Sequence, residues 1–312
     1  MPDDATRTSH PSRSGVSRRG FLAASATVAL GAAGLAAAPP AAGAPLPRLP
    51  GEVGRLQGQV TARGTVYDAV EVDIRGDRAW IAVPRSVVPG SRTAVGVAWF
   101  YHGSGSSHEA LLNGFGYEMR QLVDRGVVCI CQDAGGNGYA GPYAMRVQAD
   151  GWEYVSSLCK VGANFLRATS GGGALAAEVL GAKLLPDIVG LYFVNALWDV
   201  RRAYELGGRT EIGPAYGYST AAIDRTNPAR HPSSAWSGDR IRIVHTTTLD
   251  LVTPAAVHAI PFYERARPTA AEVTRRTHTL GHTTPRFVAD EVPLYFRRWW
   301  EAWMSEKARG LR

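Results

Sequence analysis

The stretch RATSGGGALAAEVL, residues 167–180, decides how the rest of the chain is interpreted. It differs at one position from G-x-S-x-G, the pattern of a serine nucleophile on a tight strand-to-helix turn. Ala168 stands where the first glycine is expected, and Ser170 follows two residues later. Ser170 is therefore either a nucleophile or the cap of a glycine-rich helix, which is the commoner role of a serine before a helix.

Strand and helix patterns alternate on both sides of this stretch. Segments 66–76 and 78–86 predict two antiparallel strands joined through Gly76 and Asp77, and the apolar run 93–103 predicts a strand buried on both faces. Further strands are predicted at 127–134, 164–170, 187–197, 241–248 and 272–280. Helices are predicted at 107–126, 142–160, 172–184, 254–266 and 291–304. This alternation predicts an α/β fold, a mostly parallel central sheet with helices on both faces.

Three reactive side chains fall at or just after predicted strand ends, where open α/β sheets place their active residues. Ser170 ends one strand, Asp250 follows another, and His282 follows the last, in the order Ser, Asp, His. Asp199, after the strand at 187–197, is an alternative acid. His278 is an alternative histidine, although it lies within a strand pattern.

At this point the chain resembles the α/β-hydrolase fold superfamily, over roughly residues 60–305. Four segments carry the resemblance: HGSG at 102–105, ATSGG at 168–172, VHTTTLDLVTP at 244–254 and LGHTTP at 280–285. They are similar to the oxyanion loop, the nucleophile turn, the acid loop and the histidine loop of that superfamily. The resemblance implies Ser170 as nucleophile, His282 as base and Asp250 as acid. It also implies backbone N–H groups of Ser104 and Gly171 as the oxyanion hole.

The resemblance implies a serine hydrolase that cleaves small-molecule carboxylic esters through an acyl-enzyme intermediate. Peptidases and acyltransferases use the same triad, so these reactions stay open. A non-catalytic binding protein is disfavoured because no triad member is missing. The sequence carries no signal for an oligomeric state.

A less regular segment, 199–238, is expected to form a small cap over the pocket within a single domain at 45–312. Within it, the aromatic residues Tyr216, Tyr218 and Trp236 are predicted to line an acyl or alcohol site. On the last helix, Phe296, Trp300 and Trp303 share one face and predict core packing.

Residues 1–44 have the layout of a signal peptide and linker. Arg18 and Arg19 precede an apolar, uncharged run that ends at residue 38, which predicts export by the Tat pathway. Cleavage is expected within 38–44, and an uncut anchor is the alternative. The expected location is therefore secreted or cell-envelope, with no stable membrane insertion after signal removal.

Composition and motifs favour no further partner or cofactor. A net charge of +7 without a dense Lys/Arg block is weak support for nucleic-acid binding. The three cysteines, Cys129, Cys131 and Cys159, are interpreted as small buried residues, and no metal-binding spacing is present. GNGYAG at 136–141 matches a dinucleotide-binding pattern but comes after several strands and lacks the acidic residue downstream. No cofactor is therefore predicted, and this loop is interpreted as one wall of the pocket.

Overall fold

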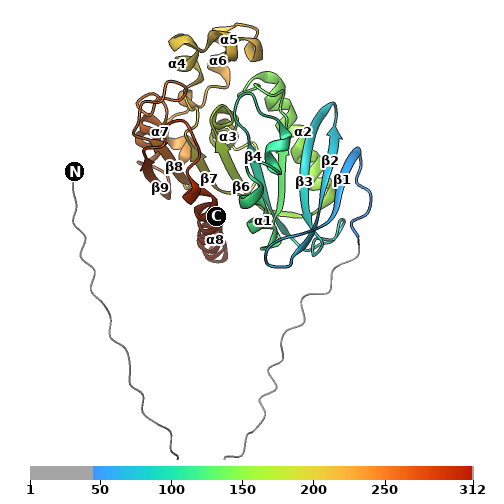
Figure 1. The fold of residues 1–312 in the computed structure, drawn as a ribbon. Helices are drawn as coiled ribbons and strands as arrows, with labels where there is room; N and C mark the ends of the chain where they lie inside the picture. The colour runs from blue at the N-terminus through green and yellow to red at the C-terminus, as the bar shows by residue number, and fades with distance from the viewer. Residues whose placement is uncertain (1–44, 311–312) are drawn as a thin grey trace, which may run out of the picture. The chain divides into compact units, whose positions relative to one another are not determined.

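The computed structural model describes residues 45–310, which form one nine-stranded sheet with helices on both faces (Figure 1). The strand order is β1-β2-β3-β5-β4-β6-β7-β8-β9. The strands are β1 (Glu52–Val60), β2 (Val66–Ile74), β3 (Asp77–Pro84), β4 (Val95–Tyr101), β5 (Val128–Gln132), β6 (Val161–Thr169), β7 (Ile188–Val194), β8 (Arg240–Thr246) and β9 (Glu272–His278). The signal-peptide prediction for 1–44 lies outside the described residues.

The sheet is antiparallel at one end and parallel over the rest. β1 pairs with β2, β2 with β3, and β3 with β5, and all three pairs are antiparallel. From β5 to β9 every neighbouring pair is parallel. The predicted mostly parallel sheet and the two predicted leading strands are confirmed, whereas β1 was not predicted. Its sequence, EVGRLQGQV, lacks regular apolar alternation because this edge strand is largely exposed.

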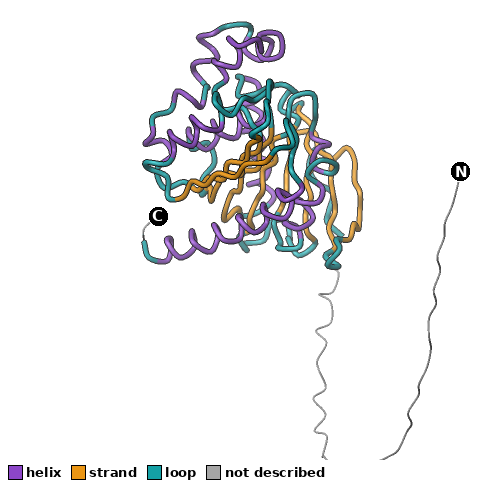
Figure 2. Tube along the Cα trace, turned by 60° about the vertical axis from the view of Figure 1, so that its left-hand side comes forward, coloured by secondary structure: helices purple, strands orange, loops and turns teal. Residues whose placement is uncertain are grey.

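Helices cover the two faces of the sheet in separate groups, as Figure 2 shows edge-on. The first group is α2 (Pro142–Leu158), α3 (Gly172–Gly181) and α7 (Ala259–Ala266), which pack with one apolar core. The second group is α1 (Gly116–Val123) and α8 (Arg286–Ala308), which pack with a second core. This two-faced covering explains why the inner strands β5, β7 and β8 are wholly buried, whereas the edge strand β9 is not.

Two helix predictions need correction. The predicted single helix 107–126 is broken into a short 3₁₀ turn, η1 (His108–Leu111), and α1, with Gly114 in the break. On α8, Phe296 and Trp303 are buried as predicted, but the third buried aromatic residue is Trp299. Trp300 is only partly buried against the same core.

The three cysteines are free and buried, as predicted. Burial raises the pKa of the Cys159 thiol to about 11, so this side chain is a neutral packing group. Within residues 45–310, no helix is both long enough and apolar enough to span a membrane.

The segment predicted as a cap connects β7 to β8 as a series of short helices. They are α4 (Val200–Ala203), η2 (Tyr204–Gly208), α5 (Arg209–Ile212), η3 (Gly213–Tyr216), α6 (Thr220–Arg225), η4 (Pro228–Arg230) and η5 (Ser233–Trp236). In Figure 1 the helices α4, α5 and α6 lie at the top of the domain. The segment leaves the sheet at the carboxyl end of β7, the same edge that carries Ser170.

Candidate active site

Ser170 occupies a strained turn between β6 and α3. Its φ is +49°, a left-handed conformation that is sterically unfavourable for a residue with a side chain. The turn is nevertheless held in place, because the Ser170 carbonyl accepts from Gly173 N–H at 3.0 Å and Leu197 N–H at 2.9 Å. Strain that the surroundings maintain is typical of functional positions.

The glycines after Ser170 are required by close backbone contacts. A Cβ at Gly172 would lie 2.3 Å from the His102 carbonyl oxygen and 2.6 Å from that of Tyr101. A Cβ at Gly171 would lie 2.3 Å from Ser104 Oγ. Ala168, in contrast, is a fully buried β6 residue whose methyl group packs in the core. The alanine in place of the first glycine is therefore accommodated, while Gly172 has no space for a side chain.

Ser170, His282 and Asp250 form a continuous hydrogen-bonded chain. Ser170 Oγ lies 3.0 Å from His282 Nε2, and His282 Nδ1 lies 2.9 Å from Asp250 Oδ2. The side chain of Asp250 is 2 % exposed and that of His282 is 29 % exposed. With Nδ1–H donating to the buried carboxylate, Nε2 is free to accept the serine proton.

The Asp250 carboxylate is held by donors from its own loop. Its Oδ1 accepts from the N–H groups of Val252 and Thr253, both at 2.9 Å, and Thr253 Oγ1 lies 2.9 Å from Oδ2. Burial alone would raise the pKa of Asp250, but the donors from Thr253 and His282 keep it below its ordinary value. Asp250 therefore stays ionised beside His282. Sequence reasoning missed Thr253.

The alternative acid, Asp199, has a different environment. Its Oδ1 accepts from Arg202 N–H at 3.0 Å, capping α4, and from Asn227 Nδ2 at 3.0 Å. The nearby His258 Nδ1 accepts from the N–H groups of Trp198 and Asp199, and burial lowers the pKa of His258 to about 4. Asp199 thus belongs to a structural network that caps α4, and His282 contacts Asp250 instead.

Asn195 links the acid loop to the histidine loop, and sequence reasoning missed it. It follows β7 with φ +39°, and its Nδ2 donates to the Thr283 carbonyl at 2.6 Å. Its own carbonyl lies 2.9 Å from Thr253 Oγ1. The alternative histidine, His278, lies 3.1 Å from Asn195 Nδ2 and so belongs to this supporting network. The only sequence signal was a polar residue at the end of an apolar strand.

The predicted oxyanion donors border the same space beside Ser170. A Cβ at Gly171 would lie 3.2 Å from Ser104 N, so the two N–H groups are close together. Among residues 45–310, neither N–H has a hydrogen-bond acceptor. Gly103 lies against the nucleophile, since a Cβ there would be 2.9 Å from Ser170 Cβ. Two unpaired donors at this place can stabilise a developing oxyanion.

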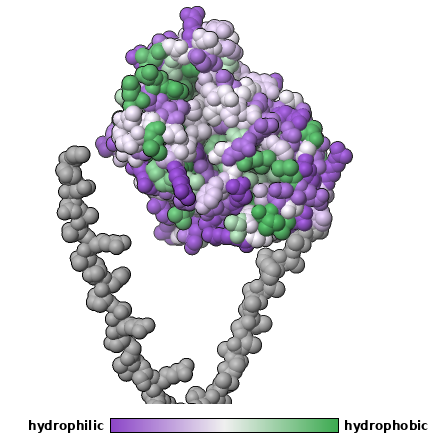
Figure 3. All heavy atoms as spheres, in the orientation of Figure 1, coloured by the Kyte–Doolittle hydropathy of each residue, from purple (hydrophilic) through white to green (hydrophobic). Residues whose placement is uncertain are grey.

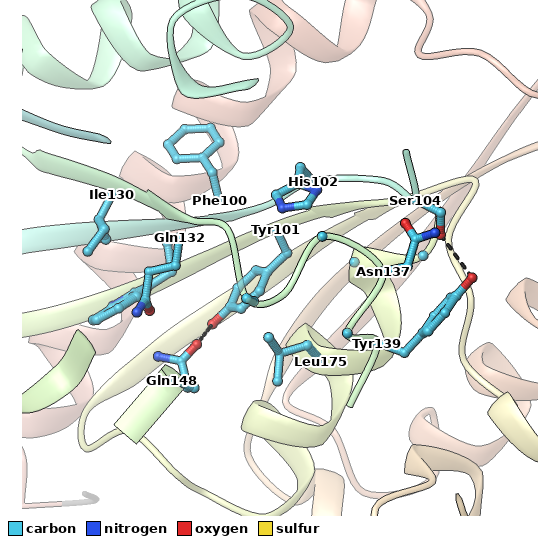
Figure 4. Close-up of a pocket in the computed structure, with 16 residues that line it drawn as sticks. Phe100, Tyr101, His102, Ser104, Ile130, Gln132, Asn137, Tyr139, Gln148 and Leu175 are labelled. Carbon is cyan, nitrogen blue, oxygen red and sulfur yellow. Dashed lines mark hydrogen bonds between the residues drawn. The ribbon is translucent and has the colours of Figure 1, made fainter. Parts of the chain in front are cut away.

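The loop 136–141 contacts the oxyanion loop, residues 102–105, through side-chain hydrogen bonds. Ser104 Oγ donates to Tyr139 Oη at 3.1 Å (Figure 4), and Gly105 N–H donates to Asn137 Oδ1 at 2.7 Å. His102 contributes too, because its ring nitrogens lie 2.9 Å from the Gly103 carbonyl and 3.0 Å from that of Asp133. The interpretation of this loop as a pocket wall is confirmed, with Tyr139 as its contact residue.

The same loop is poorly suited to a dinucleotide. A Cβ at Gly141, which precedes α2, would lie 2.5 Å from the Ala215 carbonyl, and Ala140 N–H donates to Tyr216 Oη at 3.1 Å. The start of α2 is therefore covered by η3, where a pyrophosphate would need open N–H groups. No group of three or more His, Cys, Asp or Glu side chains arranged for a metal occurs in the described part of the chain.

A cavity of about 470 Å³ opens above Ser170 and the oxyanion donors. Most of its walls are apolar, and they come from both the domain body and the predicted cap. The apolar residues include Tyr139, Leu197, Leu206, Ile212, Leu251 and Val252. Glu211 is the one carboxylate among the lining residues that the structure describes.

The three predicted aromatic substrate residues do not line this cavity, which corrects the prediction. Trp236 is fully buried and packs edge-on against Phe262 in the core. Tyr216 is buried with its hydroxyl accepting from Ala140 N–H. Tyr218 is 53 % exposed. Aliphatic side chains and Tyr139 take the place expected for these aromatics.

Comparison with known proteins supports the fold. No protein-family model matches the sequence, and no curated protein matches it either. Among solved structures, an S-formylglutathione hydrolase from Agrobacterium tumefaciens is similar with a TM-score of 0.60 and 15% identity, over 80% of this chain and 98% of that one. Est1E from Butyrivibrio proteoclasticus gives a TM-score of 0.55 at 13% identity, over 74% and 98% of the two chains.

A third similar structure is that of a peptidase. It is dipeptidyl peptidase 4 of Porphyromonas gingivalis, with a TM-score of 0.53 and 17% identity, over 77% of this chain and 35% of that one. These similarities establish the fold. The reaction has to be argued from the geometry around Ser170.

Proposed function

We propose that this chain, which has the α/β-hydrolase fold, is a serine hydrolase that cleaves carboxylic esters through an acyl-enzyme intermediate. The observation that carries the proposal is the chain Ser170–His282–Asp250, with contacts of 3.0 and 2.9 Å, next to two unpaired N–H donors. A serine with only a structural role would not need an oriented histidine and a buried carboxylate behind it.

The proposed reaction proceeds in two halves. Ser170 Oγ attacks the ester carbonyl carbon while its proton passes to His282 Nε2, and the carbonyl oxygen becomes an oxyanion facing the N–H groups of Ser104 and Gly171. When this intermediate collapses, the alcohol leaves with the proton from His282. Water then attacks the acyl-enzyme with His282 as base, releasing the carboxylic acid and restoring Ser170.

The cavity supports an apolar substrate. Its mouth carries exposed aliphatic side chains, Leu206 at 54%, Leu251 at 82% and Val252 at 59% exposure. Figure 3 shows an apolar patch at the upper left of the molecule, near the short helices α4–α6. Burying such side chains against an acyl or alcohol group contributes about 25 cal/mol per Å² of apolar surface. In this proposal the segment 199–238 is the cap that completes the apolar wall.

We also propose that the chain is exported by the Tat pathway to the cell envelope or outside. This part rests on Arg18, Arg19 and the apolar run that follows them in the sequence.

Labelling with a fluorophosphonate probe tests the proposed nucleophile. Wild type and Ser156→Ala, which removes an exposed serine on α2, should both label, whereas Ser170→Ala should not. Turnover of a short-chain ester should fall by roughly 10⁶-fold in Ser170→Ala. Equal labelling of Ser170→Ala and wild type would contradict the proposal. A matched amide and an added alcohol acceptor, assayed beside the ester, separate ester hydrolysis from peptide cleavage and acyl transfer.

A further inference from the structure

A second cavity lies at the edge of the sheet opposite to Ser170. Its volume is about 710 Å³, and it opens at the amino ends of β4 and β5, between the end of α1 and the middle of α8. None of its lining residues also lines the cavity above Ser170. Because β4 and β5 run parallel to β6, which carries Ser170 at its carboxyl end, their amino ends are a full strand length from the catalytic chain. The mechanism makes no use of this cavity.

The cavity has an aromatic wall. Phe165 and Phe296 stack with ring centroids 5.0 Å apart, and Trp300 lies 6.3 Å from Phe165. Phe165 and Phe296 are buried, while Trp300 is only partly buried and offers its ring to the cavity. A hydrocarbon chain on this wall would cover the part of Trp300 that now faces water.

The charged side chains that line the cavity are all arginines: Arg63, Arg125 and Arg297. The pKa of the Arg125 guanidinium is lowered, first by burial and then by the positive charges of Arg63 and Arg297. This guanidinium is therefore both desolvated and repelled by its neighbours. Within residues 45–310, neither Arg63 nor Arg125 forms an ion pair. In the same range the Arg125 guanidinium has one hydrogen bond, which it donates to the Gln121 carbonyl at 2.5 Å.

Carboxylates near the arginines offset part of this charge without entering the cavity. Arg297 pairs with Glu301 at 2.8 Å, one turn along α8. Asp124 attracts Arg125, but Asp124 Oδ1 already accepts from Thr61 Oγ1 and lies outside the lining. Inside the cavity the balance is positive. An anion there would relieve the repulsion and form charge-assisted hydrogen bonds with Arg125.

We propose that this cavity binds an amphipathic carboxylate, a free long-chain alkanoate. Its carboxylate contacts Arg125 and Arg63, and its chain lies along Phe165, Phe296 and Trp300. The juxtaposition of unpaired guanidinium groups with an aromatic wall carries the inference, because a simple anion would not need the wall and a neutral hydrocarbon would not need the charge. The proposal does not depend on the reaction at Ser170.

Titration of the full chain with dodecanoate, below its micelle concentration, tests the proposal by calorimetry and tryptophan fluorescence. The fluorescence change should disappear in Trp300→Phe while calorimetric binding persists. In the Arg63→Gln/Arg125→Gln double variant, affinity should fall at least about tenfold, the loss expected for charge-assisted hydrogen bonds. Arg267→Gln, which removes an exposed guanidinium on the opposite face, should bind as wild type does.

Three outcomes would overturn the proposal: equal binding of dodecyltrimethylammonium, wild-type affinity in the double variant, or arginine-dependent binding of phosphatidylglycerol vesicles without binding of dodecanoate. The last outcome would indicate a membrane surface. If the double variant fails to fold, Arg125→Gln alone gives the same test. Ser170→Ala should retain wild-type affinity, so a failure here is distinguishable from a failure of the proposed hydrolase activity.

Discussion

The two halves of the catalytic site are held together by different kinds of contact. The acid–histidine half consists of Asn195 and the loops 247–254 and 279–285. It is held by side-chain hydrogen bonds, such as those of Asn195 to Thr283 and of Thr253 to Asp250. The oxyanion half consists of residues 102–105, 136–141 and 171–173. It also has side-chain hydrogen bonds, such as that of Gly105 N–H to Asn137, but it differs in close backbone approach, with Gly172 against the carbonyl groups of residues 101 and 102.

This difference predicts which substitutions each half can tolerate. In the acid–histidine half, removal of one polar side chain leaves its buried partners without hydrogen bonds, which costs about 1–3 kcal/mol per group. In the oxyanion half, addition of one methyl group displaces backbone that cannot move aside. Polar truncations should therefore damage the first half, and small additions should damage the second.

Within these two halves, the largest effect is expected for Asp250→Asn. The amide cannot hold His282 with its proton on Nδ1, because it can present a donor where the carboxylate accepts. We expect kcat for ester hydrolysis to fall by about 10⁴-fold, the loss seen when other triads lose this carboxylate. The folded state should persist, since Val252 N–H and Thr253 N–H can still donate to the remaining amide oxygen.

Asp199→Asn is the matched control for this prediction. It removes the same charge from the alternative acid, and its amide oxygen can still cap Arg202 N–H. Turnover should stay within about threefold of wild type, because surface and capping changes have small effects on distant chemistry. A greater loss of kcat in Asp199→Asn than in Asp250→Asn would mean that the acid has been assigned to the wrong residue.

Gly172→Ala is expected to have the second-largest effect. Its Cβ would lie 2.3 and 2.6 Å from two backbone carbonyl oxygens, so the turn or the oxyanion loop must shift. We expect the free energy of unfolding to fall by about 3 kcal/mol, and kcat by about 10²-fold through misplacement of the oxyanion donors. Urea unfolding and ester turnover measure the two effects.

Gly136→Ala is the control for Gly172→Ala, because it imposes a strained backbone conformation without a close contact to any neighbouring atom. Gly136 has φ +67°, but a Cβ there would meet no atom within 4 Å. Only the conformational cost remains, about 1 kcal/mol of stability, and turnover should be unchanged. If both alanine variants behaved alike, the close contacts of Gly172 would not be what holds the oxyanion half.

The same contrast explains how much of the site was predictable from the sequence. Ser170, Asp250 and His282 could be found because a reactive residue at a strand end leaves a local pattern. Asn195 and Thr253 could not, because their roles arise only where loops from β7, β8 and β9 meet. The three substrate aromatics were misplaced for a related reason. A segment's composition shows that Trp236 is apolar, but not whether it packs inward against Phe262 or faces the cavity.

The elements of the fold, too, could be predicted only where they leave a local pattern in the sequence. The buried parallel strands were predicted because burial on both faces requires continuous apolar runs. β1 was missed because an exposed edge strand needs no such run, and its burial is only partial. Helix 107–126 was overextended because its apolar spacing continues across Gly114, where the chain breaks into η1 and α1.

Apart from the two control variants, the smallest effect on turnover is expected at Asn195, which does not contact Ser170. Asn195→Gly and Asn195→Ala both remove the amide that donates to Thr283 and accepts from Thr246 N–H. The histidine loop then loses a fixed anchor, and we expect kcat to fall about tenfold with little change in KM, because His282 spends less time in position.

The two variants should differ in stability. The φ of +39° at Asn195 is easily adopted by glycine but costs alanine about 1 kcal/mol, so Asn195→Ala should be the less stable of the two. Equal loss of kcat in both assigns the effect to the amide. Wild-type kcat in Asn195→Gly would instead show that the backbone turn alone positions His282, and the acid–histidine half would then resemble the oxyanion half in what holds it.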